Sequence, residues 1–167
     1  MATIEAEETI PRLAMPLEDA EGNSHVIDDA VAAGPIVLGI YKSSCQASKT
    51  MFPFLERLHQ RYRDRGLTVL GVAQDSANVT RSFARRSGAT FPILIEPDDF
   101  PVSVAFDIFA TPTIFVIRPD RTVAFTTMGF FRDPVNDLGR SVAALLDAPS
   151  EELFTAEDTD VPVFVPG

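Results

Sequence analysis

Residues 36–62 read IVLGIYKSSCQASKTMFPFLERLHQRY, and this stretch decides the fold. Its first part, Ile36 to Tyr41, is a continuous apolar run, which is typical of a strand buried on both faces of a sheet. Beyond Cys45, apolar residues recur every three or four positions as far as Tyr62, which predicts an amphipathic helix. The two serines before Cys45 can cap that helix. A buried strand that leads directly into a helix is the repeating unit of an α/β protein.

The rest of the chain extends this unit in both directions. Upstream, apolar pieces on either side of a Gly/Asn/Asp turn predict a β-hairpin over residues 13–27. Downstream, strands and helices alternate, and the turn at residues 118–121 makes the last two strands an antiparallel pair. Strands are predicted at residues 67–73, 92–95, 113–117 and 122–127, and helices at 28–33, 76–87, 99–106 and 133–146. This order predicts an α/β fold with a central mixed sheet, helices on both faces and an N-terminal β-hairpin extension.

The length of 167 residues suits one domain, and we expect three regions along it. Residues 1–11 are expected to be a loose acidic lead, residues 12–147 the α/β domain, and residues 148–167 an acidic tail. The end of the tail, residues 161–166, reads VPVFVP and is apolar. We expect the tail to be either mobile or laid as a strap on the domain surface or on a partner.

The charge and the single cysteine exclude several classes of protein. The net charge is −10, and basic residues form no cluster outside a helical face, so neither nucleic acid nor a membrane is an expected partner. One cysteine excludes an internal disulfide and a zinc or iron–sulfur site built by this chain alone. The sequence contains no Gly-rich phosphate loop, so we expect no metal, nucleotide or other cofactor. Nothing in the sequence indicates the oligomeric state.

The expected compartment is the cytoplasm. The first nine residues are acidic and lack the basic start and apolar run of a secretory signal. The longest apolar run, Ile36 to Tyr41, is too short to span a bilayer. A domain excised from an extracytoplasmic protein would have the same composition.

Cys45 is the main candidate for chemistry. It directly follows a buried strand at the start of a helix, where unpaired N–H groups and the helix dipole stabilise a thiolate. The only two lysines of the chain, Lys42 and Lys49, flank it and add positive charge. The position therefore predicts a reactive thiol, and the alternative is a cysteine that only fills apolar space.

Three segments resemble the thioredoxin superfamily over about residues 12–146. Residues 41–53, YKSSCQASKTMFP, resemble its active-site segment, a Cys-x-x-Cys motif with a proline eight residues after the first cysteine. Residues 110–117, ATPTIFVI, resemble its cis-proline loop and following strand, and residues 66–73 resemble the strand that follows its active-site helix. The hairpin and the segment at 76–106 resemble the redoxin branch, which includes thiol–disulfide oxidoreductases and alkyl-hydroperoxide-reductase-like proteins.

The resemblance implies a set of site residues. In that family the first cysteine is the nucleophile, and the cis-proline loop faces it and offers backbone groups to an extended substrate. The corresponding residues of this chain are the catalytic pair Cys45 and Ser48, the substrate-binding residues Ser44, Gln46, Thr111 and Pro112, and the thiolate-stabilising Lys42 and Lys49. The expected partner is a protein or a low-molecular-weight thiol or disulfide.

The departures from the family pattern limit the mechanism. Ser48 stands at the position of the second cysteine, and Gly39 stands where thioredoxins often bury an acid. Serine cannot attack a mixed disulfide, so the two-cysteine route to disulfide reduction is excluded. The hydroxyl of Ser48 can still donate a hydrogen bond to a Cys45 thiolate.

Three functions remain open. The first is a monothiol redox protein in which Cys45 forms mixed disulfides that an external or substrate thiol resolves. The second is a one-cysteine thiol peroxidase. Peroxiredoxins are disfavoured because Lys42 and Leu38 stand where their signature has threonine and proline. Glutathione peroxidases are disfavoured because they use a tryptophan in their site, and the chain has none. The third is a redox-inactive thioredoxin-fold binding module.

Other polar and aromatic residues have weaker interpretations. We expect His59 to be a surface histidine, because it lies about 21 Å along the helix from Cys45. Asp75 and Glu96 end or follow strands. We expect both side chains to be solvated carboxylates, and the alternative is that one of them transfers protons to Cys45. The arginines of the first long helix are expected on its solvated face, and four phenylalanines in the core or a groove wall. These residues are Arg57, Arg61 and Arg65, and Phe106, Phe109, Phe130 and Phe131.

Overall fold

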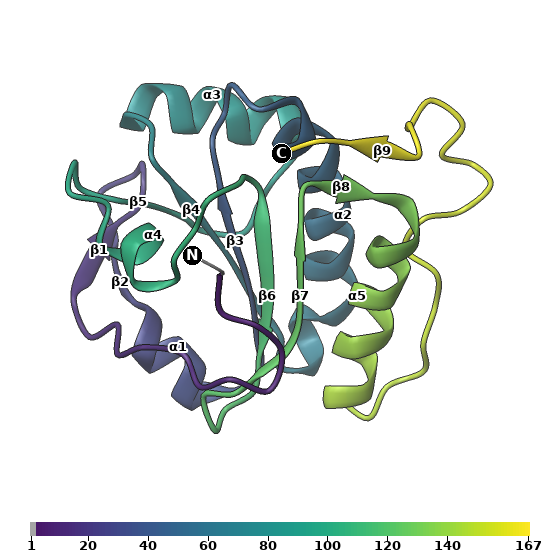
Figure 1. Cartoon of the computed structure of the whole chain (residues 1–167), viewed down its shortest axis with the longest axis horizontal. Helices are drawn as coiled ribbons and strands as arrows, with labels where there is room; N and C mark the ends of the chain where they lie inside the picture. The colour runs from purple at the N-terminus through teal and green to yellow at the C-terminus, as the bar shows by residue number, and fades with distance from the viewer. Residues whose placement is uncertain (1–2) are drawn as a thin grey trace.

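A five-stranded mixed sheet forms the centre of the computed structural model, which describes residues 3–167 (Figure 1). The strand order is β5-β4-β3-β6-β7. Strands β3, β4 and β5 are parallel, and β6 and β7 continue the sheet antiparallel. Their bounds are Ile36–Tyr41 for β3, Thr68–Ala73 for β4, Ile93–Ile95 for β5, Thr113–Ile117 for β6 and Val123–Met128 for β7.

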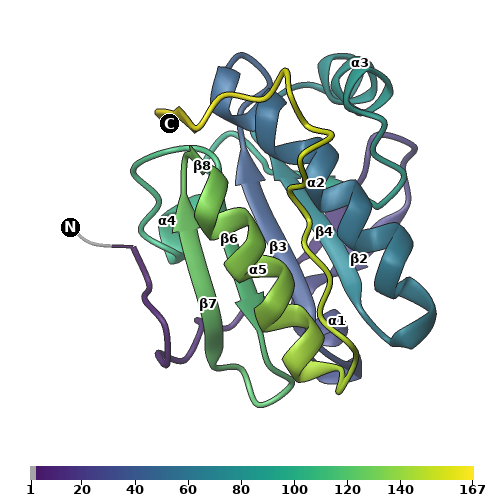
Figure 2. The ribbon, with the colours of Figure 1, turned by 90° about the vertical axis from the view of Figure 1, so that its right-hand side faces the viewer.

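Helices cover both faces of this sheet (Figure 2). Side chains of α2, α3 and α5 form one core cluster with one face of the sheet. Side chains of α1 and α4 form the other cluster with the opposite face, together with the hairpin. The helices span Ile27–Ala33 (α1), Gln46–Tyr62 (α2), Ala77–Ser87 (α3), Pro101–Ala105 (α4) and Arg132–Leu145 (α5), and a single 3-10 turn, Arg63–Arg65, follows α2.

The central strand β3 shows why both faces must be covered. All six of its residues are buried, and its side chains alternate between the two clusters. At Gly39 a Cβ atom would lie 3.1 Å from Leu55 Cδ1 and 3.2 Å from Ile114 Cδ1. The position where thioredoxins often bury an acid is therefore closed by apolar side chains.

Two small antiparallel pairs complete the fold. The predicted hairpin consists of β1, Pro16–Glu18, and β2, Ser24–Val26, and a bridge from Asp19 to Leu94 attaches it beside β5. The second pair joins β8, Phe130–Phe131, to β9, Phe164–Val165. The predicted mixed sheet, its two helical layers and the N-terminal hairpin are therefore confirmed.

The lead is better attached than its composition suggests. Met1 and Ala2 lie outside the described residues, but Thr3 Oγ1 donates to Phe106 O at 2.9 Å, and Thr9 forms a bridge with Thr122. Ile10 is buried in the α1 and α4 cluster. The prediction of a loose lead is thus wrong for residues 3–10, because residues 7–10 pair with the start of β7 and residues 3–4 bond to Phe106.

The tail lies on the surface of its own domain. It runs along α5 and α2 and then turns back to the end of the molecule where α2 begins (Figures 1 and 2). Leu153 is 1% exposed and packs where Gly139 leaves room. Of the two expectations for the tail, the strap is the one the structure shows. Among residues 3–167, none of the helices combines the length and apolar composition needed to cross a bilayer.

Candidate active site around Cys45

Cys45 is the residue directly before α2 and serves as its N-cap in an extended conformation (φ −83°, ψ 123°). Its N–H donates to Lys42 O at 3.1 Å, which closes the turn after β3. The N–H of Ser43 donates to Asp75 Oδ2 at 3.0 Å, which ties the same turn to the end of β4. These bonds hold a partly exposed thiol where the free N–H groups of a helix begin.

The surroundings of the thiol lower its pKa. Burial alone raises the pKa of Cys45, but hydrogen bonds to the sulfur outweigh that effect. The donors are the N–H and hydroxyl of Ser48, the side chain of Thr111 and the N–H of Ala47. The first turn of α2 contains no acidic residue, so no carboxylate within that turn opposes a thiolate. The site therefore favours the nucleophilic form of the sulfur.

Ser48 lies next to the thiol of Cys45 and is fully buried. Its hydroxyl has no hydrogen-bond partner among residues 3–167. The thiol of Cys45 donates to the carbonyl oxygen of Thr111 at 3.2 Å. An ionised sulfur accepts hydrogen bonds, and the hydroxyl of Ser48 is among the groups that lower the pKa of Cys45.

Thr111 and Pro112 form the wall opposite the thiol. The peptide between them is cis, as the resemblance to the cis-proline loop implied. Pro112 is buried and its carbonyl accepts from Gly129 N at 2.8 Å, whereas Thr111 is partly exposed. The structure therefore brings together Cys45, Ser48, Thr111 and Pro112 from α2 and the start of β6, residues that lie more than 60 positions apart.

Comparison with known proteins agrees with this arrangement. The family model described as AhpC/TSA family matches residues 6–126. The chain belongs to the AhpC/TSA family. This family member is similar to "Thiol-disulfide oxidoreductase ResA" of Bacillus subtilis (strain 168), with 25% identity over 114 residues. The match covers 68% of this chain and 63% of ResA, so the chain spans less than two thirds of the length of that relative.

Solved structures show the fold of this AhpC/TSA-family chain. The thioredoxin domain of a thiol-disulfide oxidoreductase from Bacteroides vulgatus has a TM-score of 0.71 and 17% identity, covering 85% of this chain and 98% of that one. Peroxidoxin BcpB from Mycobacterium tuberculosis has a TM-score of 0.69 and 20% identity, covering 88% and 99%. At these identities the likeness concerns the fold alone, which is thioredoxin-like.

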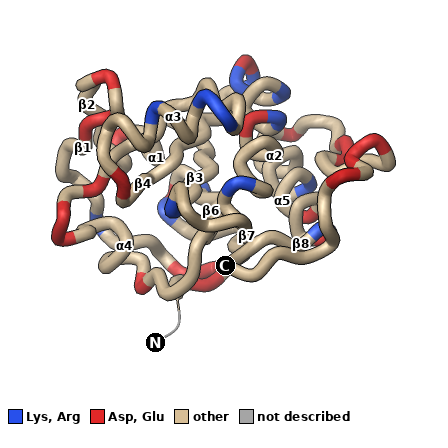
Figure 3. The backbone as a smooth tube through the Cα atoms, turned by 90° about the horizontal axis from the view of Figure 1, so that it is seen from above, with Lys and Arg blue, Asp and Glu red and all other residues tan. Residues whose placement is uncertain are grey.

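The other predicted site residues of the AhpC/TSA-family chain lie near Cys45 in the sequence. Among residues 3–167, their side chains form no hydrogen bond with its sulfur. Ser44 and Gln46 are exposed on either side of Cys45. Lys42 lines a hollow of about 240 Å³ beside Thr111, and Lys49 lines another of about 260 Å³ between α2 and α3. Neither lysine is among the groups that lower the pKa of Cys45. Basic residues also lie along α3, while acidic ones mark the hairpin and the loop before β9 (Figure 3).

Two carboxylates near the sheet ends have structural partners. Glu96 is 4% exposed and accepts from the N–H and hydroxyl of Ser103 at 2.8 and 2.5 Å. The prediction of a solvated side chain is therefore wrong for Glu96, because α4 brings donors to it. Asp75 accepts from Ser43 N and positions the loop that carries Cys45. Sequence reasoning placed Asp75 near the site but missed this role, because the bond joins two loops 32 residues apart.

Three other predictions need correction. His59 is half-buried beside Phe91, with ring centroids 6.0 Å apart, so it is not a free surface histidine. Arg57 donates to Leu153 O and to Asp158, and Arg61 donates to Glu151 O. These arginines hold the tail rather than facing only solvent.

The four phenylalanines divide between core and surface. Phe106 and Phe130 are fully buried, whereas Phe109 and Phe131 are 62% and 42% exposed. Phe109 lines the hollow beside Thr111. It is therefore a wall residue, which is one of the two positions predicted for it. Phe131 stacks on Phe164 of the tail, with ring centroids 4.6 Å apart.

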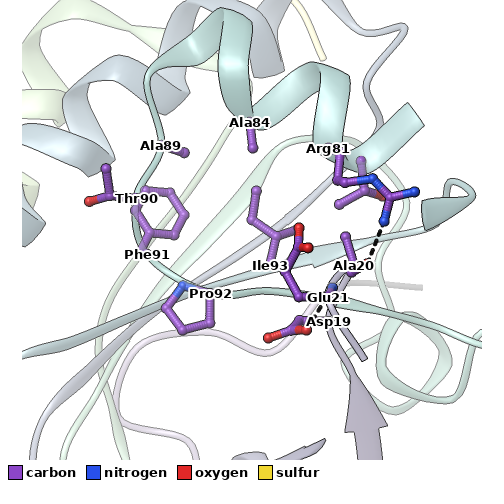
Figure 4. Close-up of a pocket in the computed structure, with 11 residues that line it drawn as sticks. Asp19, Ala20, Glu21, Arg81, Ala84, Ala89, Thr90, Phe91, Pro92 and Ile93 are labelled. Atoms are coloured by element: carbon purple, nitrogen blue, oxygen red, sulfur yellow. Dashed lines mark hydrogen bonds between the residues drawn. The ribbon is translucent and has the colours of Figure 1, made fainter. Parts of the chain in front are cut away.

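A separate hollow of about 280 Å³ lies between the turn of the hairpin and α3 (Figure 4). Arg81 of α3 crosses it and donates to Ala20 O at 2.6 Å. Its lining includes Asp19, Thr90 and Ile93 and shares no residue with the hollow beside Thr111. It therefore lies outside the candidate active site. Within residues 3–167, no group of three or more His, Cys, Asp and Glu side chains is arranged to hold a metal ion.

Proposed function

We propose that this protein catalyses monothiol thiol–disulfide exchange with Cys45 as its nucleophile. The observation that carries the proposal is the thiol of Cys45 at the start of α2, where donors from Ala47, Ser48 and Thr111 lower its pKa. The similarity to a relative named for thiol–disulfide oxidoreduction adds support.

The exchange proceeds in two balanced steps. The Cys45 thiolate attacks one sulfur of a substrate disulfide, forming a mixed disulfide and releasing the other sulfur as a thiolate that takes up a proton. A second thiolate, from the substrate or from a low-molecular-weight thiol, then attacks the substrate sulfur of the mixed disulfide. Cys45 leaves as a thiolate, and the donors at the start of α2 stabilise it in both steps. Since the chain has one cysteine, the second thiol comes from outside it.

The neighbouring residues have distinct roles in this proposal. Ser48 donates its hydroxyl to the thiolate but does not resolve the mixed disulfide. Thr111 presents its backbone to the substrate next to the sulfur, and Pro112 fixes that backbone through the bond from Gly129. Ser44 and Gln46 are exposed where a substrate approaches Cys45.

One pair of assays tests the function. The full chain is incubated with a glutathionylated protein and reduced glutathione, and in parallel with hydrogen peroxide and a thiol, with Cys45→Ser as the matched control. We expect turnover in the first assay, a mixed disulfide on Cys45 by mass spectrometry, and neither result for Cys45→Ser. Turnover only with peroxide would assign a one-cysteine peroxidase instead. No turnover in either assay with Cys45 unmodified would leave a binding module and overturn the proposal.

A further inference from the structure

The last seven residues of the tail, 161–167, contain the short strand β9 and lie beside the candidate active site. Phe130 pairs with Val165 and Phe131 with Phe164 in an antiparallel ladder. Arg132 N donates to Val163 O at 3.0 Å, which continues the pairing toward α5. Figures 1 and 2 show this segment returning to the end of the molecule at which α2 begins. Backbone pairing of this kind is how an extended peptide docks on a strand edge.

The segment ends against the residue that faces the thiol. A Cβ atom at Gly167 would clash with Thr111 O and lie 3.4 Å from Thr111 N, so position 167 lies directly over the polar backbone atoms of Thr111. A Cβ atom at Gly129, whose φ is +69°, would lie 3.2 Å from both Val165 O and Gly167 N. A glycine at both positions permits this close approach. Because Thr111 O also accepts from the Cys45 thiol, the segment covers the backbone next to the sulfur.

The two parts of the tail differ in how firmly they are attached. The earlier part is held by the buried Leu153 and by Asp158, which receives two hydrogen bonds from Arg57 at 2.9 and 2.6 Å. In the final part, Val163 and Phe164 are 61% and 50% exposed. The segment 161–167 can therefore leave β8 while the rest of the tail stays in place.

Space remains beside the segment for a small molecule. The hollow of about 240 Å³ is lined by Lys42, Gln74, Phe109, Thr111 and Gly167 itself. Cys45 itself is partly exposed, so a small disulfide does not need to displace the segment to reach the sulfur. A polypeptide that pairs with the backbone of Thr111 needs the position that Gly167 occupies.

We propose that residues 161–167 are a built-in occupant of the polypeptide-docking edge formed by β8 and Thr111, so that a protein disulfide reaches Cys45 only after displacing them. The proposal rests on the proposed exchange function and specifies its regulation. The sequence of the occupant, VPVFVPG, is uncharged in a chain of net charge −10, so the edge fits an extended apolar segment. Small disulfides bypass the occupant and report the intrinsic reactivity of Cys45.

The test compares two substrates in three variants of the full chain. The variants are a deletion of residues 161–167, Phe164→Ala, which removes the stack on Phe131, and Met15→Ala as a control at an exposed apolar residue of the hairpin region. The substrates are hydroxyethyl disulfide and a disulfide-bonded polypeptide with an extended apolar segment.

We expect the deletion to raise the polypeptide rate roughly tenfold, which is the gain when the open form is about a tenth of the population. Phe164→Ala should raise the polypeptide rate by about two- to sixfold, because it only weakens the closed form. The small-disulfide rate should stay within about twofold in every variant, and Met15→Ala should change neither rate.

A binding experiment separates this proposal from the proposed function. The synthetic peptide VPVFVPG is added to the deletion variant, and amide NMR shifts of Thr111, Gly129 and Phe131 are followed. We expect shifts at these residues, and the peptide should slow the polypeptide reaction. An unchanged or slower polypeptide rate after deletion, or a peptide that shifts none of these amides, would overturn the proposal that residues 161–167 occupy the docking edge. Failure of Cys45 to react with either substrate, while the peptide still binds, would overturn the exchange function alone.

Discussion

Ser48 lies three residues after Cys45, and its buried hydroxyl, which has no hydrogen-bond partner within residues 3–167, is among the groups that lower the pKa of the Cys45 thiol. The serine therefore changes what the second position of the motif does. A cysteine there attacks a mixed disulfide, whereas this serine stabilises the nucleophile before the attack and the leaving thiolate after it.

Ser48→Ala should raise the pKa of Cys45. The change removes one hydrogen bond to a charged sulfur, worth about 1.5–3 kcal/mol, which corresponds to roughly one to two pKa units. The rate of iodoacetamide alkylation as a function of pH measures this shift. At a pH below both the native and the new pKa, alkylation should slow by about ten- to a hundredfold. Thr50→Ala is the matched control, because the hydroxyl of Thr50 bonds to Gln46 O in the same helix. Equal pH profiles for Ser48→Ala and the native chain would show that the hydroxyl does not contact the thiolate.

Ser48→Cys should restore internal resolution of the mixed disulfide. A thiol at this position is held next to Cys45, and a linked group has an effective concentration of about a millimolar or more. Release of a preformed Cys45 mixed disulfide should then proceed without added thiol, about tenfold faster than the native chain with roughly 0.1 mM external thiol. Stopped-flow measurement of the released thiol checks this. A variant that holds its mixed disulfide as long as the native chain would show that position 48 cannot reach the sulfur.

Asp75→Ala should loosen the loop that carries Cys45. The substitution leaves the N–H of Ser43 without its acceptor, and an unpaired buried group costs about 1–3 kcal/mol in the free energy of unfolding. Asp75→Asn keeps an oxygen acceptor and should lose less than half as much. Urea denaturation of both variants measures the difference, and Asp99→Ala, at an exposed carboxylate, serves as control. If both Asp75 variants lose the same stability, charge rather than the bond to Ser43 explains the effect.

The sequence predicted the parts of the site that depend on local order and on motif spacing. The apolar run of β3 and the helical spacing after Cys45 place the thiol without any long-range information. The prediction that the two serines before Cys45 cap the helix is wrong, because Cys45 itself is the N-cap and no side chain caps it. The burial of Glu96 could not be predicted in this way, because it depends on Ser103 N and Oγ, which the start of α4 brings back to the sheet. The position of residues 161–167 on β8 could not be predicted from the sequence either. Their apolar composition left both a mobile tail and a strap open, and the pairing with β8 brings Gly129 and Gly167 together from positions far apart in the sequence.

The attachment of the tail should depend on pH through Asp158. The hydrogen bond and charge of Arg57 lower the pKa of Asp158 from 3.8 to about 2. A carboxyl whose pKa is lower in the folded state contributes stability above its unfolded pKa and loses it as pH falls through the folded value. The ion pair should therefore stabilise the protein above about pH 4 and stop doing so between about pH 4 and pH 2.

Asp158→Asn tests this directly. The variant should lose about 1–2 kcal/mol of unfolding free energy at neutral pH, less than the full pKa shift implies because Arg57 is 41% exposed. The difference from the native chain should shrink steeply toward pH 2, where the native carboxyl is about half protonated, and approach zero below it. Other carboxyls with lowered pKa values, such as Asp28, titrate in the same range in both proteins and cancel in the difference. A difference that stays constant from pH 7 to pH 2 would show that Asp158 acts through packing and not through its charge, and high salt should then leave it unchanged.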